Sequence, residues 1–408
     1  MRDGAISAKE RARSRAAERD LGRLGVTMVP DGWKLSTVGK ACTIRNDLRL
    51  PLSVETRSAM QGKYPYYGPT GVLDYLDEFR AEGEFALIGE DGDHFLDTAK
   101  KSQTVRVSGR FNVNNHAHLI ASGKSCAVDW FFHFFRHRDI SHSLTRQGAG
   151  RYKLTKQALE KLPILLPPLP EQRKIAEILR AWDEALEKLT ALRAAKARRL
   201  DGLRFALLFG ELRLNGHRHN WAPTRLDAVT HELTRRNGAK GLGRDCVMGV
   251  TKAEGVVPMR EQTVAADISR YKRLPPRAFA YNPMRINVGS IAMNERGKEV
   301  LVSPDYVVFA CNVDGLDPDY LDHLRKTSWW AHYINSGGSG SVRQRTYYDD
   351  LAALKLPLPE LDEQKAIAAV LNTARADLAV TEREIEAVTR QKRGLMQKLL
   401  TGDWRVTR

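Results

Sequence analysis

The stretch Pro168-Leu169-Pro170-Glu171-Gln172 decides the fold, together with its counterpart Pro359-Glu360-Leu361-Asp362-Glu363-Gln364. Each stretch stands at the start of a long amphipathic segment. Residues 162–214 and 354–406 match at a constant shift of 192 residues, with no gap over more than fifty positions. A match of that length indicates an internal duplication. The sequence therefore predicts the order domain, long helix, domain, long helix.

Both amphipathic segments carry helix start signals and a continuous apolar seam. Proline disfavours helical backbone in the residue before it, and Glu171 and Glu363 place negative charge at the positive end of the helix dipole. Apolar residues then recur every four and three positions, as in a coiled coil. The seam comprises Ile175, Leu179, Trp182, Leu186, Leu189, Leu200, Leu203 and Leu207, and then Ile367, Leu371, Ala374, Leu378, Ile385, Val388, Leu395 and Leu399. Its gaps are Arg193, Lys196, Thr381 and Lys392.

Chain connectivity predicts how the helices pair. The second helix starts at the second domain, so it can bury its seam on the first helix only by running back. We therefore expect an antiparallel coiled coil within a mixed α+β fold. The alternative is two independent helices, each packed on its own domain. The expected divisions are a charged N-terminal helix (1–27), a first domain (28–165), a first long helix (166–214), a second domain (215–358) and a second long helix (359–408).

Composition and charge indicate which class of molecule the chain binds. The 408 residues carry a net charge of +16, with +4 on residues 28–165 and +5 on residues 215–358. A basic excess on two similar blocks favours two units that contact a polyanion, although an ordinary basic surface remains the alternative. Four cysteines without a C-x-x-C pair predict neither disulfides nor a zinc ribbon. The sequence shows no apolar run of spanning length and no apolar stretch in a signal-peptide position, so we expect a cytoplasmic protein.

The motifs for catalysis or metal binding are incomplete. Gly123-Lys124-Ser125 lacks the earlier glycine of a phosphate-binding loop, because position 118 is histidine. Asn282-Pro283-Met284 lacks the second proline and the aromatic residue of the amino-methyltransferase motif. His116 and His118 alternate as on one strand face, yet no acidic or cysteine ligand is near in sequence, so hydrogen bonding is the favoured role. We therefore expect no catalytic residue, no metal and no cofactor in this chain.

Binding chemistry is present in exposed-looking loops of both halves. Tyr66, Tyr67 and Thr70 lie in an aromatic and glycine-rich segment. Gly-rich segments with Arg and Gln precede both long helices, and such side chains can contact phosphates and read base edges. A solvated turn is the alternative for each residue taken alone. The candidate DNA-binding residues are Tyr66, Tyr67, Thr70, Asn114, Asn115, His116, Arg146, Gln147, Arg151, Asn282, Arg285, Asn287, Ser339, Arg343, Gln344 and Arg345.

From about Pro30 onward, the chain resembles the DNA specificity subunit of type I restriction-modification systems. The repeated run of leucine and proline that ends in Glu-Gln before each helix, residues 167–172 and 356–364, carries the resemblance, although the second copy inserts Asp362. Four internal segments also resemble that family's target-recognition domains: residues 66–71, 87–92, 114–118 and 280–287. A fifth, residues 302–306, does so as well. The charged leader 1–27 is longer than the pattern needs.

The resemblance implies two α/β target-recognition domains, each reading one half of a split double-stranded DNA site. It implies helices that set the spacer and bind two methyltransferase (modification) subunits, joined by ATP-dependent restriction subunits. S-adenosylmethionine, ATP and Mg would then belong to those partners. Two alternatives remain open: a self-contained methyltransferase or nuclease with disguised motifs, which would bind S-adenosylmethionine or cleave DNA alone, and a coiled-coil DNA scaffold without sequence preference.

Overall fold

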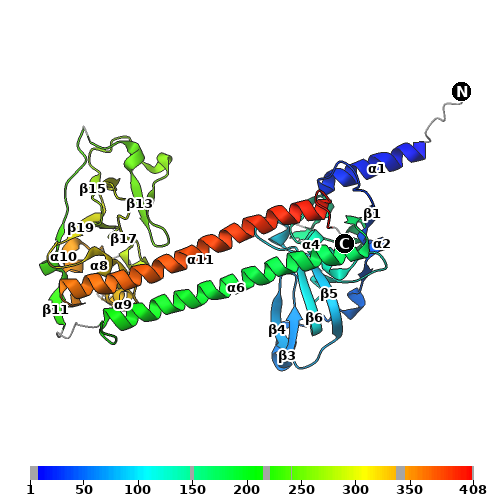
Figure 1. Cartoon of the computed structure of the whole chain (residues 1–408), viewed down its shortest axis with the longest axis horizontal. Coiled ribbons are helices and arrows are strands. Elements are labelled where there is room, and N and C mark those ends of the chain that lie inside the picture. Colours follow the sequence, from blue (N-terminus) through cyan, green and yellow to red (C-terminus); the bar gives the residue numbers. More distant parts are fainter. Residues whose placement is uncertain (1–7, 148–150, 215–220, 240, 337–344, 407–408) are drawn as a thin grey trace. The chain divides into compact units, whose positions relative to one another are not determined.

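The computed structural model describes residues 8–147, 151–214, 221–239, 241–336 and 345–406 (Figure 1). The chain divides into two compact units, residues 1–188 with 385–408, and residues 189–384. Each unit holds one globular domain and one part of each long helix, α6 (Leu169–Leu208) and α11 (Leu361–Thr401). Among the described residues, no helix has a stretch apolar and long enough to cross a membrane.

The first domain is built on a six-stranded sheet of order β2-β7-β5-β6-β3-β4. Its central strand β5 is buried on both faces, because Phe85 and Leu87 belong to one apolar cluster whereas Ala86 and Ile88 belong to another. The sheet strands are β2 (Thr43–Ile44), β3 (Gln61–Tyr67), β4 (Val72–Leu76), β5 (Ala81–Gly89), β6 (Thr104–Val113) and β7 (Ala117–Ala121). The other elements are α1 (Ala8–Leu24), β1 (Lys34–Thr37), α2 (Val38–Ala41), η1 (Asn46–Leu48), α3 (Val54–Ala59), η2 (Asp93–Leu96), α4 (Val128–Phe135), η3 (Ser141–Ser143), β8 (Thr145–Gln147), β9 (Arg151–Lys153), α5 (Lys156–Lys161) and β10 (Pro163–Leu166).

The second domain repeats the core of this topology. Its four-stranded sheet has the order β12-β19-β16-β17, which matches β2-β7-β5-β6 strand for strand. The second domain has two separate ribbons, β13–β14 and β15–β18, whereas the first domain extends its sheet with β3 and β4. The strands are β11 (Ala222–Arg225), β12 (Thr230–Glu232), β13 (Met248–Thr251), β14 (Gly255–Pro258), β15 (Lys272–Leu274), β16 (Phe279–Tyr281), β17 (Ile291–Met293), β18 (Val300–Val302), β19 (Val307–Cys311) and β20 (Lys355–Leu358). The helices are α7 (Leu226–Val229), η4 (Arg244–Cys246), η5 (Glu261–Thr263), η6 (Ile286–Val288), α8 (Pro318–Leu324), α9 (Ser328–Ser336) and α10 (Tyr348–Ala352).

The duplicated glutamine fastens each long helix to its domain in the same way. The Gln172 side chain accepts a hydrogen bond from the Ala127 amide (2.9 Å) and donates to the Ser125 and Pro167 carbonyls (both 2.8 Å). Gln364 accepts from the Asp317 amide (2.8 Å) and donates to the Gly315 (3.1 Å) and Pro359 (2.9 Å) carbonyls. Because a buried amide must satisfy its donors and acceptor, this residue type fits both positions.

The duplicated glutamate also has matched partners in the two units. The Trp33 indole donates to Glu171 (3.2 Å), and Arg405 pairs with the same carboxylate (2.8 Å). In the second unit, Trp221 donates to Glu363 (3.0 Å) and Arg213 pairs with it (2.8 Å). Arg213 and Arg405 differ by the same 192 positions as the helices. Each glutamate therefore anchors a tryptophan and an arginine, in addition to meeting the helix dipole.

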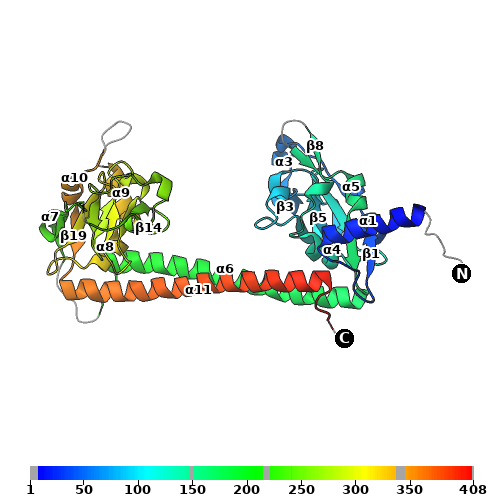
Figure 2. The ribbon, with the colours of Figure 1, turned by 90° about the horizontal axis from the view of Figure 1, so that it is seen from above.

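Within each unit, the two long helices lie side by side and run in opposite directions (Figure 2). The first unit pairs the start of α6 with the end of α11, and the second unit pairs the end of α6 with the start of α11. Every predicted seam position is buried or half-buried except Arg193, which is exposed. The antiparallel pairing that the sequence predicts is confirmed, and the alternative of two independent helices is wrong.

Three of the four polar gaps of the seam, Lys196, Thr381 and Lys392, form bonds between the helices. Lys196 donates to Asp377 (2.7 Å) and to the Thr381 hydroxyl (3.0 Å) in the second unit. Lys392 pairs with Asp183 in the first unit. Thr381 and Lys392 are buried. These positions therefore contribute specific pairs to the interface, because a polar group buried at a seam favours the register that satisfies it.

The buried carboxylate of Asp322 links the second domain to helix α11. Asp322 on α8 contacts Arg325 (2.5 Å), Lys326 (2.6 Å) and, on α11, Arg375 (3.5 Å), and it is only 2% exposed. Burial alone would raise the pKa of Asp322, but Arg325 and Lys326 outweigh that effect and hold the pKa below its usual value. Arg325 and Lys326 thus share one carboxylate, whereas Arg375 also pairs with Glu295 (2.6 Å).

We expect Asp322→Asn to lower the free energy of unfolding of the full chain by roughly 1–3 kcal/mol at pH 7, because the buried side chain loses its charge-assisted hydrogen bonds to Arg325 and Lys326. The lowered pKa means that this stabilisation is present above the unfolded-state value of about 3.9 and is lost as the pH falls through the folded-state value. The difference between the wild type and Asp322→Asn should therefore shrink below about pH 4. Urea unfolding at several pH values measures it.

The matched control is Asp305→Asn, which removes the same charge from an exposed side chain of the same domain. Its effect should stay within about 0.5 kcal/mol. Equal losses of stability in the two variants would contradict the role assigned to Asp322.

Candidate nucleic-acid interface

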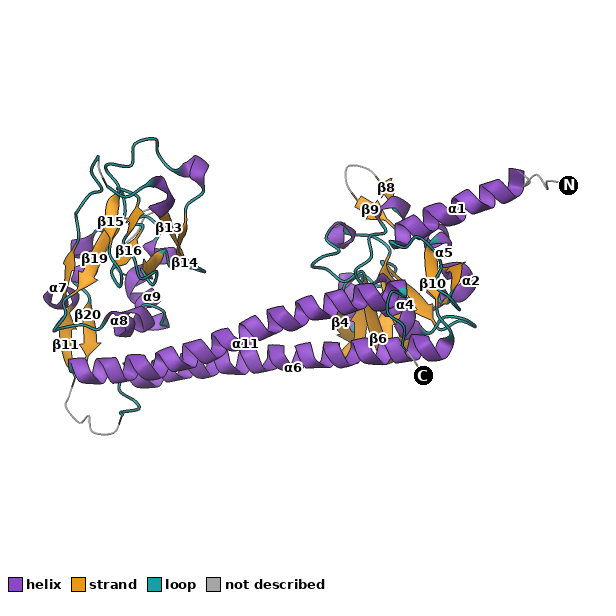
Figure 3. Cartoon of the chain, turned by 45° about the horizontal axis from the view of Figure 1, so that its top comes forward, coloured by secondary structure: helices purple, strands orange, loops and turns teal. Residues whose placement is uncertain are grey.

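Four segments of the first domain lie together at the end of strand β5, and we call their described residues, 67–70, 90–93, 114–116, 145–147 and 151–153, the first loop cluster; Figure 3 shows its β8–β9 ribbon. Backbone hydrogen bonds join them: the Asn114 amide donates to the Tyr67 carbonyl (3.0 Å), and the Glu90 amide donates to the His116 carbonyl (2.7 Å). The Leu154 amide donates to the Glu90 carbonyl (2.7 Å). The cluster thus brings together segments that lie far apart in the sequence.

Most of the described candidates in this cluster face solvent. Thr70, Asn115, His116 and Arg146 are exposed, and Tyr67 is half-buried. The Arg146 guanidinium lies 5.5 Å from the ring centroid of Tyr152, an arrangement that extends it along the surface. Gln147 and Arg151 are directly paired residues of the β8–β9 ribbon. The exposed set combines hydroxyl, amide and guanidinium groups, which suit contacts with phosphates and base edges.

Two candidates have structural roles instead. Tyr66 is fully buried, and its hydroxyl donates to the Leu50 carbonyl (2.8 Å) and accepts from the Leu52 amide (3.2 Å). The expectation that Tyr66 reaches DNA is therefore corrected: strand alternation turns Tyr66 inward and leaves Tyr67 at the surface. Asn114 is also buried, and its side-chain oxygen accepts from the His116 amide (2.9 Å), which shapes the turn.

A half-buried network of charged side chains holds the segments of the first loop cluster together. Glu90 contacts Arg49 (2.7 Å), Lys153 (3.2 Å) and His118 (3.8 Å). Burial alone would raise the pKa of Glu90, but His118, Lys153 and Arg49 together lower it. This network fixes the loop after β5 against the β8–β9 ribbon. Sequence reasoning missed Arg49 and Lys153, because no local pattern links them to Glu90.

His118 belongs to this network through both of its ring nitrogens. Its Nδ1 lies 2.6 Å from the Arg49 guanidinium, and its Nε2 lies 2.8 Å from the Leu154 carbonyl. Because a guanidinium can only donate, Nδ1 accepts and the Nε2–H donates. Burial lowers the pKa of His118. In the described part of the chain, no three His, Cys, Asp or Glu side chains gather in the manner of metal ligands.

The second domain has an equivalent cluster after the equivalent strand, formed by residues 282–289 and 345–347, which we call the second loop cluster. The Thr346 amide donates to the Pro283 carbonyl (3.1 Å), so the two segments predicted separately lie together. Arg285, Asn287 and Arg345 are exposed, whereas Asn282 is half-buried and accepts from the Met284 amide (2.9 Å). Ser339, Arg343 and Gln344 lie outside the described residues.

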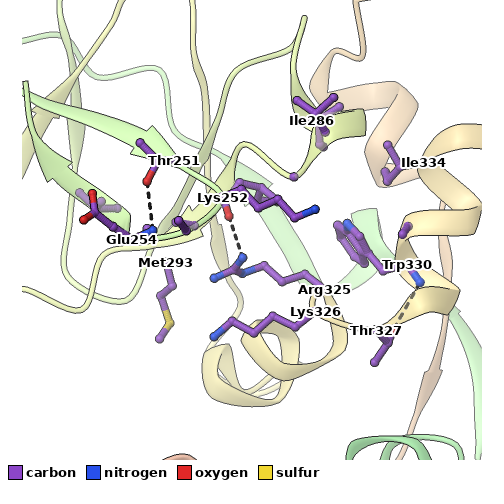
Figure 4. Close-up of a pocket in the computed structure, with 18 of the residues that line it drawn as sticks. Thr251, Lys252, Glu254, Ile286, Met293, Arg325, Lys326, Thr327, Trp330 and Ile334 are labelled. Carbon is purple, nitrogen blue, oxygen red and sulfur yellow. Dashed lines mark hydrogen bonds between the residues drawn. The ribbon is translucent and has the colours of Figure 1, made fainter. Parts of the chain in front are cut away.

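A cavity of about 580 Å³ adjoins the second loop cluster (Figure 4). Ile286 and Trp330 form apolar wall, and Lys252, Arg325 and Lys326 contribute cationic side chains. Arg325 and Lys326 are paired with Asp322, but Lys252 is exposed and has no ion-pair partner within the described ranges. Sequence reasoning missed Lys252, which lies in the turn between β13 and β14 and packs its stem on Gly289, where a Cβ would approach it to 3.1 Å.

The fold and the two loop clusters define a duplicated two-domain protein whose polar loops are presented from equivalent strands. Residues 30–196 match the type I restriction modification DNA specificity domain. A Haemophilus influenzae protein assigned as a type I restriction enzyme specificity subunit is 27% identical over 372 residues, covering 83% of this chain and 86% of that protein. The MjaVIII specificity subunit of Methanocaldococcus jannaschii is 21% identical over 408 residues, covering 93% of this chain and 94% of its own length.

The fold is also that of a solved relative. The crystal structure of the type I restriction-modification S subunit from M. genitalium matches 91% of this chain and 99% of its own length, with a TM-score of 0.61 and 12% identity. The matched domain model, the specificity-subunit names of these relatives and the shared fold agree with the family that the repeated helix start predicted.

Proposed function

We propose that this chain reads a bipartite double-stranded DNA site, with the first loop cluster on one half-site and the second loop cluster on the other. The observation that carries the proposal is the presence of two clusters after the equivalent strands β5 and β16, each with exposed arginine and amide side chains. Phosphate contacts from arginine give salt-dependent affinity, whereas bidentate contacts to base edges give sequence preference. The arginine and amide side chains of the two loop clusters can make contacts of both types.

The long helices dock two modification subunits in this proposal, and ATP-dependent restriction subunits join that core. In this proposal, S-adenosylmethionine, ATP and Mg bind to those partner subunits, and this chain supplies no catalytic residue. Exposed apolar side chains on the outer faces of the helices support docking: Leu192 and Phe205 on α6, and Val370 and Val380 on α11.

We expect Arg146→Ala, Arg285→Ala and Arg345→Ala each to weaken DNA binding by the assembled complex. An arginine that contacts a phosphate should weaken binding to all sequences alike and lower the salt slope by about one unit. An arginine that contacts guanine should cost about 1–3 kcal/mol and relax one base position. Titrations of specific and random duplexes at several salt concentrations separate the two outcomes.

The control for these variants is Arg19→Ala, which removes an exposed arginine from α1. It should leave affinity, salt slope and sequence preference unchanged. If the three loop variants behave like Arg19→Ala, the loop clusters are not the DNA-binding surface.

A further inference from the structure

A second cavity, of about 480 Å³, lies in the first unit and is separate from the first loop cluster. The ends of α1 and α11 and the segment after α4 surround it, and these elements lie close together in Figures 1 and 2. Its volume is that of a small-molecule site. Its polar lining includes Arg138, Arg393 and His133, and its apolar lining includes Leu24, Phe134 and Met396.

The cavity has an excess of cations without matching carboxylates. Arg138 donates to the Phe134 (3.2 Å) and Leu24 (3.0 Å) carbonyls, and its guanidinium stacks 4.1 Å from the centroid of the Phe134 ring. Arg393 donates to the Ala99 carbonyl (2.6 Å). Among the described residues, no carboxylate pairs with either arginine.

One acid and one further cation complete the charges on the lining. Asp139 accepts a hydrogen bond from the Ser141 amide (2.8 Å), and Arg23 is paired with Asp20 (3.5 Å). Burial lowers the pKa of Arg138 to about 10, so its charge persists at pH 7 although desolvation disfavours it. An enclosed guanidinium without a counter-ion is costly, and a bound anion would offset that cost.

A buried histidine on the same lining has unused hydrogen-bonding capacity. His133 is 4% exposed, and its Nδ1 has no hydrogen-bond partner within the described ranges. Burial lowers the pKa of His133 to about 4, so the ring is neutral at pH 7 and carries one N–H. A buried polar group of this kind is normally satisfied.

The second half of the chain provides an internal comparison. Residues 130–134 of α4 align with residues 320–324 of α8 at a shift of 190, which places His133 over His323. His323 bonds Asn372 through Nε2 (3.0 Å) and accepts from Arg204 at Nδ1 (3.4 Å). At the shift of 192 residues, Asn372 corresponds to Arg180 and Arg204 corresponds to Met396. The second unit therefore satisfies this histidine, whereas the first unit has neither partner at the matching positions and has a cavity beside the ring.

We propose that this cavity binds a phosphate group, held by the guanidinium groups of Arg138 and Arg393 and by a hydrogen bond from His133. Arginine forks match the tetrahedral oxyanion, and charge-assisted hydrogen bonds are the stronger kind. The phosphate comes from inorganic phosphate or from a mononucleotide, whose organic part would contact the apolar wall. Because Arg138 also bonds the Leu24 carbonyl, the ligand would fasten the leader helix α1 to the end of α11. The site does not depend on DNA reading.

Calorimetric titration of the full-length chain with sodium phosphate, AMP and adenosine, at constant ionic strength, tests the site. We expect saturable binding of phosphate or AMP and none of adenosine. Equal affinities for phosphate and AMP identify the free ion as sufficient, and tighter binding of AMP identifies a nucleotide. Arg393→Gln should weaken binding about tenfold or more, since it removes a charged hydrogen-bond donor. Arg138→Gln should have the same effect where the variant folds.

The matched control is Arg390→Gln, which removes the same charge from an exposed position of α11 outside the cavity. It should leave the affinity unchanged. Absence of saturable binding of both phosphate and AMP would overturn the proposal. Binding that Arg393→Gln leaves intact, or adenosine binding as tight as that of AMP, would overturn it as well.

Discussion

Exchange of residues 43–154 for the matching segment of another family member is expected to replace one half of the recognised DNA site completely and to leave the other half unchanged. These limits keep β1, α2, α5 and β10 from the original chain, so the β1–β10 pairing and the α2–α5 packing stay intact. The exchanged segment contains the whole first loop cluster, whereas the second loop cluster belongs to the other unit. Sequencing of methylated bases in cells that carry the exchanged complex reports both halves at once.

The reciprocal exchange in the second domain is the control for this experiment, and it should alter only the other half-site. A change in both halves after a single exchange would contradict the assignment of one half-site to each domain.

Removal of one heptad from both helices is expected to shorten the spacer between the half-sites without altering either half. Deleting residues 186–192 and 383–389 retains the contacts of Asp183 with Lys392 and of Lys196 with Asp377, and it preserves the seam period. Seven helical residues rise roughly 10 Å, which corresponds to at most about three base pairs of B-DNA. Methylation mapping and stability measurements on the assembled complex follow the change.

The control deletion removes residues 186–192 from α6 alone. It should break the register of the paired helices and lower stability, because the buried pairs then cannot all form. A double deletion that folds normally and keeps the original spacer would show that the helices do not set the distance.

The sequence predicts the larger features of this fold well, because they depend on local pattern. The duplication, both long helices and the seam follow from period and shift, and the structure confirms the antiparallel pairing. The partners of the seam gaps could not be predicted, since Lys392 meets Asp183 across 209 positions of the chain. The predicted domain boundaries remain predictions. In the structure, each of the two compact units includes part of both long helices.

The candidate interface was predictable only in part. Glycine-rich and aromatic segments indicated the loops, but adjacent residues on a strand face opposite sides, and no pattern decided whether Tyr66 or Tyr67 is buried. The ion pairs that hold the first loop cluster together could not be predicted either, because Arg49, Glu90 and Lys153 come from three separate segments. Side-chain networks of this kind depend on tertiary contacts that local propensity does not encode.

The most direct test of the central claim is a genome-wide map of methylated adenines in a host whose only modification complex contains this chain. The proposed function predicts one bipartite motif, with two defined half-sites separated by a spacer of fixed length and free sequence. A single contiguous motif, or methylation without any motif, would contradict the claim that two domains each read half of one site.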